Sequence, residues 1–251
     1  MKKNIKTEDT IKRWDNFAET YSKSHTEQGD VHKEIFLNPT LFSLMGTVKN
    51  KKILDAGCGE GYLSRLLAKS DANVTAVDYS PKMIEIARER TPNELSIHYI
   101  EGNCEDLHSL EDASFDLIVS NMVIHDLENY KKTFKEMFRL LVDGGTFVFS
   151  ILHPCFVTPG SGWEKTENGE KLHWNVDNYF YEGAYEQKLG NTEKMVYFHR
   201  TLTTYINTLI QTGFTLECMV EPVPSKEMLE KYPSFEEDFR CADFMVFKLK
   251  K

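Results

Sequence analysis

The N-terminal part of the chain carries hydrophobic side chains at the spacing of an amphipathic helix. This apolar stripe consists of Ile11, Trp14, Phe17, Ala18 and Tyr21. Their recurrence at three- and four-residue intervals predicts a helix over residues 10–22. A second helix is predicted over residues 35–48, where Pro39 lies near the start and suits the first turn of a helix.

From residue 52 onward, short apolar runs alternate with helical patterns. The strands predicted from these runs cover residues 52–55, 73–78, 97–101, 115–120 and 146–151. The helices predicted with them cover residues 62–69, 82–89 and 130–141. Ser80 is expected to cap the middle helix, and Pro81 occupies its first turn. Strands that alternate with helices at this spacing predict a parallel sheet with helices on both faces.

Polar residues stand at or just beyond the end of each predicted strand. They are Asp55, Asp78, Asn103, Asn121 and His153. Ligands of parallel α/β sheets bind beyond the carboxyl ends of the strands, near the point where the strand order reverses. The pattern therefore predicts a binding site at this edge of the sheet.

The regular alternation stops after His153. The aromatic side chains of residues 153–195 are Phe156, Trp163, Trp174, Tyr179, Phe180, Tyr181 and Tyr185. Such a length is uncommon for a plain connection, and the aromatic content argues against disorder. We interpret residues 153–200 as an insertion beside the binding site. A helix over residues 202–212, followed by Gly213, and strands over residues 214–220 and 244–249 complete the predicted elements.

Composition narrows the class of protein. The 251 residues are enough for one α/β domain with a sizeable core, and the net charge of −9 disfavours nucleic acid as a partner. The 5 cysteines form no Cys-x-x-Cys pair, so no metal site is predicted and a reducing cytoplasm fits best. Neither a signal peptide nor a run of about 18 apolar residues occurs, so no membrane span is predicted.

The candidate chemistry concentrates in a glycine turn after the first strand, Asp55-Ala-Gly-Cys-Gly-Glu-Gly61. Glycine lets the backbone enter left-handed conformations and lets a ligand approach closely. The start of the next helix adds unpaired N–H groups and a positive dipole end. Asp78 closes the second strand, where a carboxylate accepts hydrogen bonds from ribose hydroxyls. These features predict a nucleoside cradle, and the alternative is a turn that only tightens the joint between strand and helix.

Two classes of cofactor compete for this cradle. A nicotinamide dinucleotide fingerprint requires a third glycine at position 62, where this chain has Tyr62, and its third glycine is Gly61. Asp55 places a negative charge beside the turn, which is unfavourable for a pyrophosphate and favourable for an ammonium or sulfonium group. Glu60 adds to that charge. The charge pattern therefore favours S-adenosylmethionine over NAD.

The same segments resemble the motifs of the class I S-adenosylmethionine-dependent methyltransferases. The matching segments are 53–61 (glycine turn), 77–80 (acidic loop), 102–107 (adenine loop), 115–121 (fourth strand) and 141–145 (second glycine turn). The pattern Trp14-Asp-x-x-Ala-x-x-Tyr21 is similar to the lid helix of the ubiquinone-biosynthesis-like branch, methyltransferase types 11 and 25. The resemblance is strong over residues 13–152. Asn103 and Asp143 depart from the usual aspartate and proline.

The resemblance implies a Rossmann-like, doubly wound sheet of seven strands. This sheet would be mostly parallel, with an antiparallel last strand and helices on both faces. We expect the whole chain, residues 1–251, to form a single methyltransferase domain. Its expected parts are an N-terminal helical lid (1–48), a cofactor-binding core (49–152), a substrate-side insertion (153–200), and a C-terminal helix with the last strands (201–251).

The resemblance also implies a set of cofactor-binding residues. They are Tyr21, Asp55, Ala56, Gly57, Cys58, Gly59, Gly61, Tyr62, Asp78, Tyr79, Ser80, Met83, Asn103, Cys104, Glu105, Asn121 and Met122. The residues implied at the methionine part are Asp55, Gly57 and Gly59, with Tyr21 covering it and the Asn121 carbonyl near its amino group. Those implied at the nucleoside are Asp78 for the ribose, Tyr79 and Met83 beside the adenine, and the Asn103 side chain and Cys104 backbone at its edge.

Catalytic residues are harder to predict, because a methyl group on a sulfonium is already electrophilic. A general base is needed only where the acceptor must lose a proton early. His153 and His125 follow predicted strands and are the candidates, the alternatives being a turn histidine that bonds backbone and a packing histidine. Phe156, Trp163 and His199 are predicted on the substrate side, the alternative being that they pack the insertion or begin a helix.

The predicted activity is methyl transfer from S-adenosylmethionine to a small-molecule acceptor by in-line displacement, with S-adenosylhomocysteine as the product. We expect a cytoplasmic monomer or homodimer. An RNA- or tRNA-base methyltransferase is the first alternative and requires a face rich in lysine and arginine, whereas the basic runs at 49–52 and 248–251 are short. A non-catalytic cofactor-binding protein is the second alternative.

Overall fold

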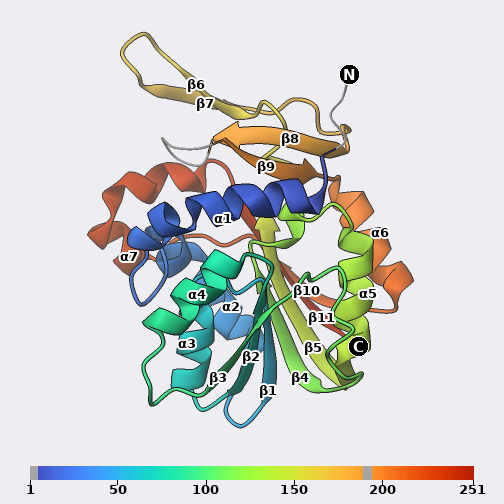
Figure 1. Ribbon diagram of the computed structural model, residues 1–251. Coiled ribbons are helices and arrows are strands. Elements are labelled where there is room, and N and C mark those ends of the chain that lie inside the picture. Colours follow the sequence, from blue (N-terminus) through green and yellow to red (C-terminus); the bar gives the residue numbers. More distant parts are fainter. Residues whose placement is uncertain (1–4, 189–193) are drawn as a thin grey trace.

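The computed structural model describes residues 5–188 and 194–251, shown in Figure 1. Residues 1–4 of the expected lid and 189–193 of the expected insertion therefore lie outside the described residues. The strands of the central sheet are β1 (Lys52–Ala56), β2 (Asn73–Asp78), β3 (Ile97–Glu101), β4 (Phe115–Asn121), β5 (Leu141–Leu152), β10 (Thr215–Val220) and β11 (Phe244–Lys250).

These seven strands lie in the order β10-β11-β5-β4-β1-β2-β3. The pairs β5–β4, β4–β1, β1–β2 and β2–β3 are parallel, and β11 runs antiparallel to both of its neighbours, β5 and β10. The predicted fold class, a mostly parallel seven-stranded sheet with an antiparallel last strand, is confirmed. The strand order changes direction between β1 and β4, so the carboxyl ends of these two strands frame the expected ligand site.

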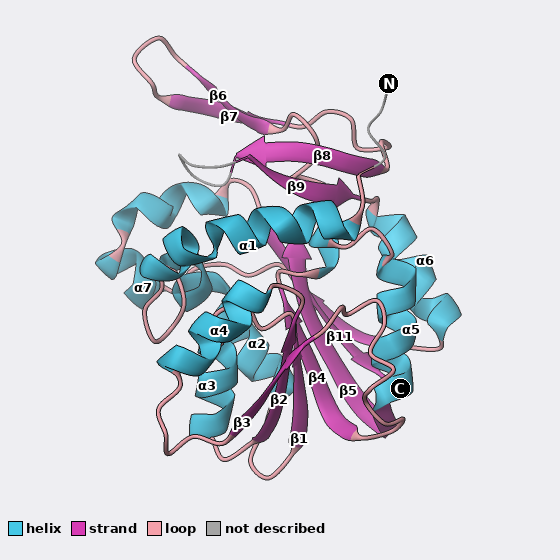
Figure 2. Cartoon of the chain, in the orientation of Figure 1, coloured by secondary structure: helices cyan, strands magenta, loops and turns pink. Residues whose placement is uncertain are grey.

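Helices cover both faces of this sheet (Figure 2). They are α1 (Thr7–Lys23), α2 (Asn38–Met45), α3 (Tyr62–Lys69), α4 (Pro81–Arg90), α5 (Tyr130–Leu140), α6 (Leu202–Thr212) and α7 (Lys226–Lys231). One apolar core joins α5 and α6 to the side chain of Leu54, and the other joins α2, α3 and α4 to that of Ile53. Successive strand residues thus point to opposite faces, which makes the sheet apolar on both sides.

Two predicted elements differ from the observed ones by more than their end residues. The helix expected over residues 35–48 is a π-helical turn, η1 (Lys33–Leu37), followed by α2, which ends where Gly46 adopts a left-handed φ of 63°. The strand expected over residues 146–151 begins earlier, because Leu141 already pairs with Phe115 before the register shifts around the glycine turn.

The insertion is more regular than the sequence predicts. It contains two antiparallel hairpins, β6 (Gly162–Lys165) with β7 (Lys171–Asn175), and β8 (Gly183–Lys188) with β9 (Lys194–His199). In Figure 1 the second hairpin lies over α1, and the first projects away from the body of the molecule. Met195 and Tyr197 of β9 are buried against Phe17 of α1, so the inward-facing side chains of this strand pack on that helix.

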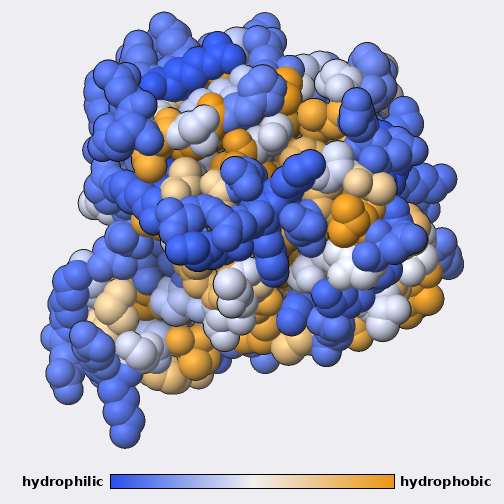
Figure 3. Space-filling view, turned by 90° about the horizontal axis from the view of Figure 1, so that it is seen from below, coloured by the Kyte–Doolittle hydropathy of each residue, from blue (hydrophilic) through white to orange (hydrophobic). Residues whose placement is uncertain are grey.

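The opposite edge of the sheet, where the parallel strands begin, is shown from below in Figure 3. Hydrophilic side chains cover most of this face, and hydrophobic ones are scattered among them. The cavities that concern function lie at the other edge, near two short helical turns, η2 (Ile124–Asp126) after β4 and η3 (Pro233–Phe239) before β11.

Candidate functional site

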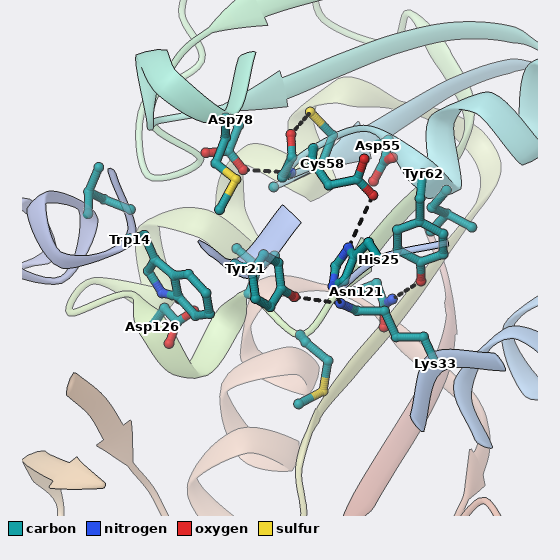
Figure 4. A pocket seen from close by; sticks show the side chains of 18 of the residues that line it. Trp14, Tyr21, His25, Lys33, Asp55, Cys58, Tyr62, Asp78, Asn121 and Asp126 are labelled. Carbon is teal, nitrogen blue, oxygen red and sulfur yellow. Dashed lines mark hydrogen bonds and ion pairs between the residues drawn. The ribbon is translucent and has the colours of Figure 1, made fainter. Parts of the chain in front are cut away.

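A cavity lies beneath α1 at the carboxyl ends of β1, β2 and β4, and Figure 4 shows it from close by. The residues that line it are Ile11, Trp14, Tyr21, His25, Lys33, Asp55, Gly57, Cys58, Gly59, Glu60, Tyr62, Leu63, Asp78, Met83, Asn121, Met122, Val123, Asp126 and Leu127. The predicted cofactor-binding residues among them are Tyr21, Asp55, Gly57, Cys58, Gly59, Tyr62, Asp78, Met83, Asn121 and Met122.

The three glycines of the turn have different roles. All three have positive φ, 84° at Gly57, 54° at Gly59 and 83° at Gly61. A Cβ at Gly57 would lie 2.3 Å from Cγ2 of Val123, and one at Gly61 would lie 2.6 Å from the hydroxyl of Tyr99. A Cβ at Gly59 would meet no atom within 4 Å. Packing therefore requires the outer two glycines, while the middle one faces open space that a ligand can occupy.

Asp78 ends β2 with its carboxylate held by two backbone amides. The amide of Gly59 donates to Oδ2 at 2.8 Å, and that of Ser80 donates to Oδ1 at 2.9 Å. Burial raises the pKa of Asp78, and these two hydrogen bonds oppose the increase. Because an ionised carboxylate has about four acceptor positions, these two amides leave capacity for ribose hydroxyls. The residue thus fits the role predicted for it.

Asp55 is a buried carboxylate at the end of β1, with an exposed fraction of 1%. The hydroxyl of Ser64 donates to its Oδ2 at 2.5 Å. Burial raises the pKa of Asp55 to about 7, although the Ser64 hydrogen bond lowers it. A cation bound beside this group would favour its ionised form, which agrees with the prediction of a positively charged ligand.

Glu60 differs from what the sequence suggests. Its carboxylate contacts the guanidinium groups of Arg65 at 2.8 Å and Arg90 at 3.3 Å, and Nδ1 of His25 at 3.1 Å. Burial would raise the pKa of Glu60, but the hydrogen bonds from His25 and Arg65 lower it overall. Its negative charge is therefore compensated within the protein, and Asp55 alone retains the role that we predicted for both.

Lys33 is a site residue that the sequence analysis missed. Its ammonium donates to the hydroxyl of Tyr21 and to Oδ2 of Asp30 at 3.0 Å, and it lies 3.3 Å from Nε2 of His25. Only 8% of its side chain is exposed. Lys33 belongs to the π-helical turn η1, and no motif signals it. Only the folded path of residues 24–33 brings its ammonium to the cavity (Figure 4).

Asn121 and Tyr62 are joined in a relay of side-chain hydrogen bonds. Ser150 donates to Oδ1 of Asn121 at 2.5 Å, Nδ2 of Asn121 donates to the hydroxyl of Tyr62 at 2.7 Å, and that hydroxyl donates to Asn38 at 3.1 Å. The relay fixes the end of β4. The next residue, Met122, has a φ of 61°, and strained residues of this kind cluster at functional sites.

The remaining predicted cofactor-binding residues surround the cavity but are not among those that line it. They are Ala56, Gly61, Tyr79, Ser80, Asn103, Cys104 and Glu105. Ser80 caps α4 by accepting from the amide of Met83 at 3.1 Å, and Oδ1 of Asn103 accepts from the amide of Glu105 at 2.9 Å. These contacts shape the loops that follow β2 and β3, and direct contact of these residues with a cofactor stays a prediction.

His153 occupies a different setting from the one predicted for a base. It is 2% exposed, its Nε2 lies 2.9 Å from Glu221, and its Nδ1 accepts from the amide of Cys155 at 3.2 Å. Both ring nitrogens are thus engaged. This geometry matches the alternative interpretation, a histidine that orders the turn after β5.

The three residues predicted on the substrate side are also engaged in packing. The ring centroid of Phe156 lies 4.6 Å from that of His153. Trp163 packs edge-on against Trp174, with 5.4 Å between their ring centroids. Both ring nitrogens of His199 lie near backbone carbonyls, those of Tyr181 at 2.6 Å and Pro154 at 3.0 Å. His199 borders a minor cavity of about 10 Å³, and these predictions gain no geometric support.

A second cavity of about 460 Å³ adjoins the first. Its lining residues are Trp14, Tyr21, Asp30, His32, Lys33, Leu37, Met122, His125, Leu152, Val157, Trp174, Gln187, Tyr197, Asp243 and Phe244. Trp14, Tyr21, Lys33 and Met122 line both cavities. His125, the other histidine predicted as a base, lies in the wall of the second cavity.

The part of the chain that the structure describes, residues 5–188 and 194–251, contains no group of three or more His, Cys, Asp or Glu side chains placed to hold a metal ion. It also contains no helix that is both long and apolar enough to cross a membrane.

Comparison with known proteins shows similarity to methyltransferases. Residues 54–149 match the family described as "Methyltransferase domain". An uncharacterised protein of Haemophilus influenzae is 32% identical over 235 residues, which cover 90% of this chain and 89% of that protein. The solved structure of an S-adenosylmethionine dependent methyltransferase from Mesorhizobium loti is 31% identical with a TM-score of 0.76, covering 85% of this chain and 96% of the other.

Two relatives with named activities match over shorter stretches. The malonyl-[acyl-carrier protein] O-methyltransferase of Serratia marcescens is 33% identical over 122 residues, 48% of this chain and 46% of that protein. The ubiquinone biosynthesis O-methyltransferase of Coxiella burnetii is 35% identical over 113 residues, 44% of this chain and 47% of that protein. Each alignment thus spans about half of the relative.

Proposed function

We propose, from the premise that this chain belongs to the S-adenosylmethionine-dependent methyltransferases, that it transfers a methyl group to a small-molecule acceptor. Its cofactor is S-adenosylmethionine. The observation that best supports the proposal is the arrangement at the ends of β1 and β2. There, open space above Gly59 lies beside the amide-held carboxylate of Asp78 and the buried carboxylate of Asp55.

The residues of the first cavity fit the parts of this cofactor. Asp78 would accept hydrogen bonds from the ribose hydroxyls, and Asp55 would lie on the side of the methionine ammonium. Lys33, with Tyr21, lies at the other end of the same cavity and would face the methionine carboxylate. When bound, the cofactor supplies a methyl group made electrophilic by a sulfonium. The protein's contribution is to hold the acceptor in line with that methyl, which is worth on the order of 7–11 kcal/mol.

We propose that α1 serves as the lid over this cofactor. It is tied to the core by a hydrogen bond from Nε1 of Trp14 to Oδ2 of Asp126 at 3.1 Å, and by one from Ser80 to Asp15 at 2.6 Å. The first cavity has about 90 Å³ of free volume beneath it. Small-molecule sites commonly have about 300–1,000 Å³, which supports an outward movement of α1 when the cofactor enters.

The relatives support a small molecule as the acceptor, because one acts in ubiquinone biosynthesis and another on a malonyl group carried by a protein. The net charge of −9 gives little attraction for RNA. We propose a cytoplasmic protein, a monomer or homodimer, whose domain comprises lid, core, insertion and last strands as predicted. Titration with tRNA at moderate salt tests the RNA alternative. Binding of tRNA at micromolar concentration would favour that alternative.

The direct test of the cofactor site is calorimetry with S-adenosylmethionine on the wild type and Asp78→Ala. We expect the variant to lose about 1–3 kcal/mol of binding free energy, the scale of charge-assisted hydrogen bonds. Asp116→Ala is the matched control, since that carboxylate accepts from the amide of Lys52 at the far end of the sheet. Equal affinity of wild type and Asp78→Ala would refute the ribose assignment. Failure of the wild type to bind would refute the proposed function.

A further inference from the structure

The second cavity lies directly beside the proposed cofactor site. Four side chains, those of Trp14, Tyr21, Lys33 and Met122, line both cavities. Two of them, Tyr21 and Lys33, stand at the end of the first cavity assigned to the methionine part. A molecule in the second cavity would therefore be next to the end of the cofactor that carries the methyl group.

The size and lining of this cavity suit a small, largely apolar ligand. Its volume of about 460 Å³ falls within the usual range of small-molecule sites, about 300–1,000 Å³. The apolar and aromatic residues that line it are Trp14, Tyr21, Leu37, Met122, Leu152, Val157, Trp174, Tyr197 and Phe244. Binding of an apolar body against this surface is favourable, by about 25 cal/mol for each Å² of apolar surface removed from water.

The charges in the lining are balanced or negative. The ammonium of Lys33 forms an ion pair with Asp30 at 3.0 Å and, with the cofactor bound, would also face the methionine carboxylate. The ring of His32 lies 3.8 Å from the carboxylate of Asp30. Asp243 adds another acidic side chain to the lining. A carboxylate or phosphate entering the cavity would lose its hydration without meeting a cation free of an acidic partner, which is costly. The lining therefore disfavours anionic ligands.

His125 supplies the polar feature of the cavity. Its Nδ1 is buried without a hydrogen-bond partner, and its Nε2 lies 4.0 Å from Oδ1 of Asp126, beyond hydrogen-bond distance. Within the described residues its imidazole thus forms no hydrogen bond. Burial, assisted by Arg200, lowers the pKa of His125 to about 3, so the ring is neutral near pH 7 and has one acceptor nitrogen. A neutral ring that carries its hydrogen on Nδ1 accepts at Nε2, so a donor on the ligand would give this imidazole a hydrogen bond, and polar groups without one are uncommon in protein interiors.

We infer that the second cavity is the acceptor site and that it takes a neutral, largely apolar molecule whose hydroxyl oxygen receives the methyl group. This inference rests on the proposed function. The oxygen–carbon bond forms while the carbon–sulfur bond breaks, and its electron pair remains on sulfur. The hydroxyl proton passes to Nε2 of His125, the nitrogen nearer to Asp126 and hence to the cofactor cavity, leaving an imidazolium.

Three probes with the same bicyclic body test the class of ligand: 2-naphthol, 2-naphthoate and 2-naphthylamine. We expect calorimetry in the presence of saturating S-adenosylhomocysteine to give at least tenfold tighter binding of 2-naphthol than of 2-naphthoate. With S-adenosylmethionine, the naphthol should be methylated and the amine should not. The inference is wrong if 2-naphthol does not bind, if the carboxylate binds as tightly, or if the amine is methylated as fast.

Variants of the hairpin β6–β7 test the location. Trp174 lines the cavity, whereas Leu172 on the same strand is 50% exposed and does not. Trp174→Ala should weaken 2-naphthol binding by about tenfold, and Leu172→Ala should leave it unchanged. S-adenosylhomocysteine should bind both variants like the wild type. Equal effects of the two substitutions on 2-naphthol binding would overturn the assignment of the cavity.

Variants of His125 test the polar contact. His125→Leu should weaken 2-naphthol binding at least fivefold, and His125→Gln, whose side-chain oxygen can accept a hydrogen bond, should recover part of the loss. Naphthalene, which lacks the hydroxyl, should bind all three proteins alike. A parallel loss for naphthalene would show that His125 only shapes the cavity. Because S-adenosylhomocysteine binding is measured separately, failure here is distinct from failure of the proposed function, in which the cofactor itself would not bind.

Discussion

The two cavities beneath α1 are built from different parts of the chain. The first is formed mainly by the loops that follow β1, β2 and β4, and its free volume is about 90 Å³. The second is formed by η1, the end of β5, the hairpins of the insertion and the start of β11, and its volume is about 460 Å³. The sheet itself thus shapes the cofactor site, whereas excursions from the sheet shape the proposed acceptor site.

The polar chemistry of the two cavities also differs. The first presents the carboxylates of Asp55 and Asp78, which suit a cation and a pair of hydroxyls. The second presents the compensated pair Lys33–Asp30 and the neutral imidazole of His125. One cavity therefore selects its ligand by charge and by the placement of acceptors, and the other mainly by apolar shape. Substitutions that affect one cavity without the other test this division.

The largest effect is expected for Gly57→Ala. The new Cβ would lie 2.3 Å from Cγ2 of Val123 on a backbone whose φ is +84°. Relief of this clash would displace Val123, which lines the first cavity, and an overpacking cost of about 1–3 kcal/mol predicts a loss of cofactor affinity of about 5- to 150-fold. Calorimetry with S-adenosylhomocysteine measures it. Gly144→Ala is the control, because its φ is +73° but its Cβ would meet no atom within 4 Å. Equal affinities of the two variants would argue against packing as the reason for Gly57.

The same division explains what the sequence can predict. The strands that carry the first cavity are short apolar runs with turn residues at fixed places, so β2 and β3 were predicted at their observed limits. Asp55 and Asp78 lie at the ends of β1 and β2, and Gly59 lies in the turn after β1, so local sequence places them at the cavity. Local patterns also indicate the helix α1, although not what its side chains contact.

The second cavity depends on contacts between distant segments. Lys33, Trp174 and Asp243 come from three separate excursions, and only the folded path brings them into one wall. No periodicity marks the hairpin β8–β9 as a partner of α1. His153 illustrates the converse case: its position after a strand suggests a catalytic role, and local sequence does not reveal that its ring nitrogens contact Glu221 and the amide of Cys155.

The next largest effect is expected from the titration of Asp55. Burial raises its pKa to about 7, against the lowering by its Ser64 hydrogen bond. Raising the pH through 7 ionises the carboxyl and strengthens its attraction for the ligand ammonium. S-adenosylhomocysteine affinity should therefore rise about tenfold from pH 6 to pH 8, a change of about 1.4 kcal/mol. Adenosine, which lacks the ammonium, and the variant Asp55→Asn should show no such rise. If the rise in affinity persists in Asp55→Asn, the titrating group is not Asp55.

A smaller effect on both cavities is expected for Trp14→Phe. This change removes the indole hydrogen bond to Asp126 but keeps an aromatic ring beside Tyr21, whose centroid lies 5.2 Å away. Loss of one such bond, about 0.5–1.5 kcal/mol, predicts a 2- to 12-fold weaker binding of S-adenosylhomocysteine and of 2-naphthol alike. Phe180→Leu, at a ring of the insertion that is 87% exposed, is the control. An effect on only one ligand would mean that α1 does not close the two cavities together.

The smallest effect is expected in the pH dependence of the transfer itself. Burial and the charge of Arg200 lower the pKa of His125 to about 3, so its imidazole is already neutral at pH 5.5. With both substrates saturating, the rate of 2-naphthol methylation should not fall as the pH decreases from 7.5 to 5.5, although an ordinary histidine near 6.5 would be protonated there. Stopped assays with radiolabelled methyl groups, run in parallel on His125→Gln, measure this. A decrease with a midpoint near 6.5 in the wild type but absent from His125→Gln would show that the occupied cavity restores an ordinary pKa. In that case the pKa of His125 with substrate bound would be higher than the value of about 3 that burial and Arg200 produce in the free protein.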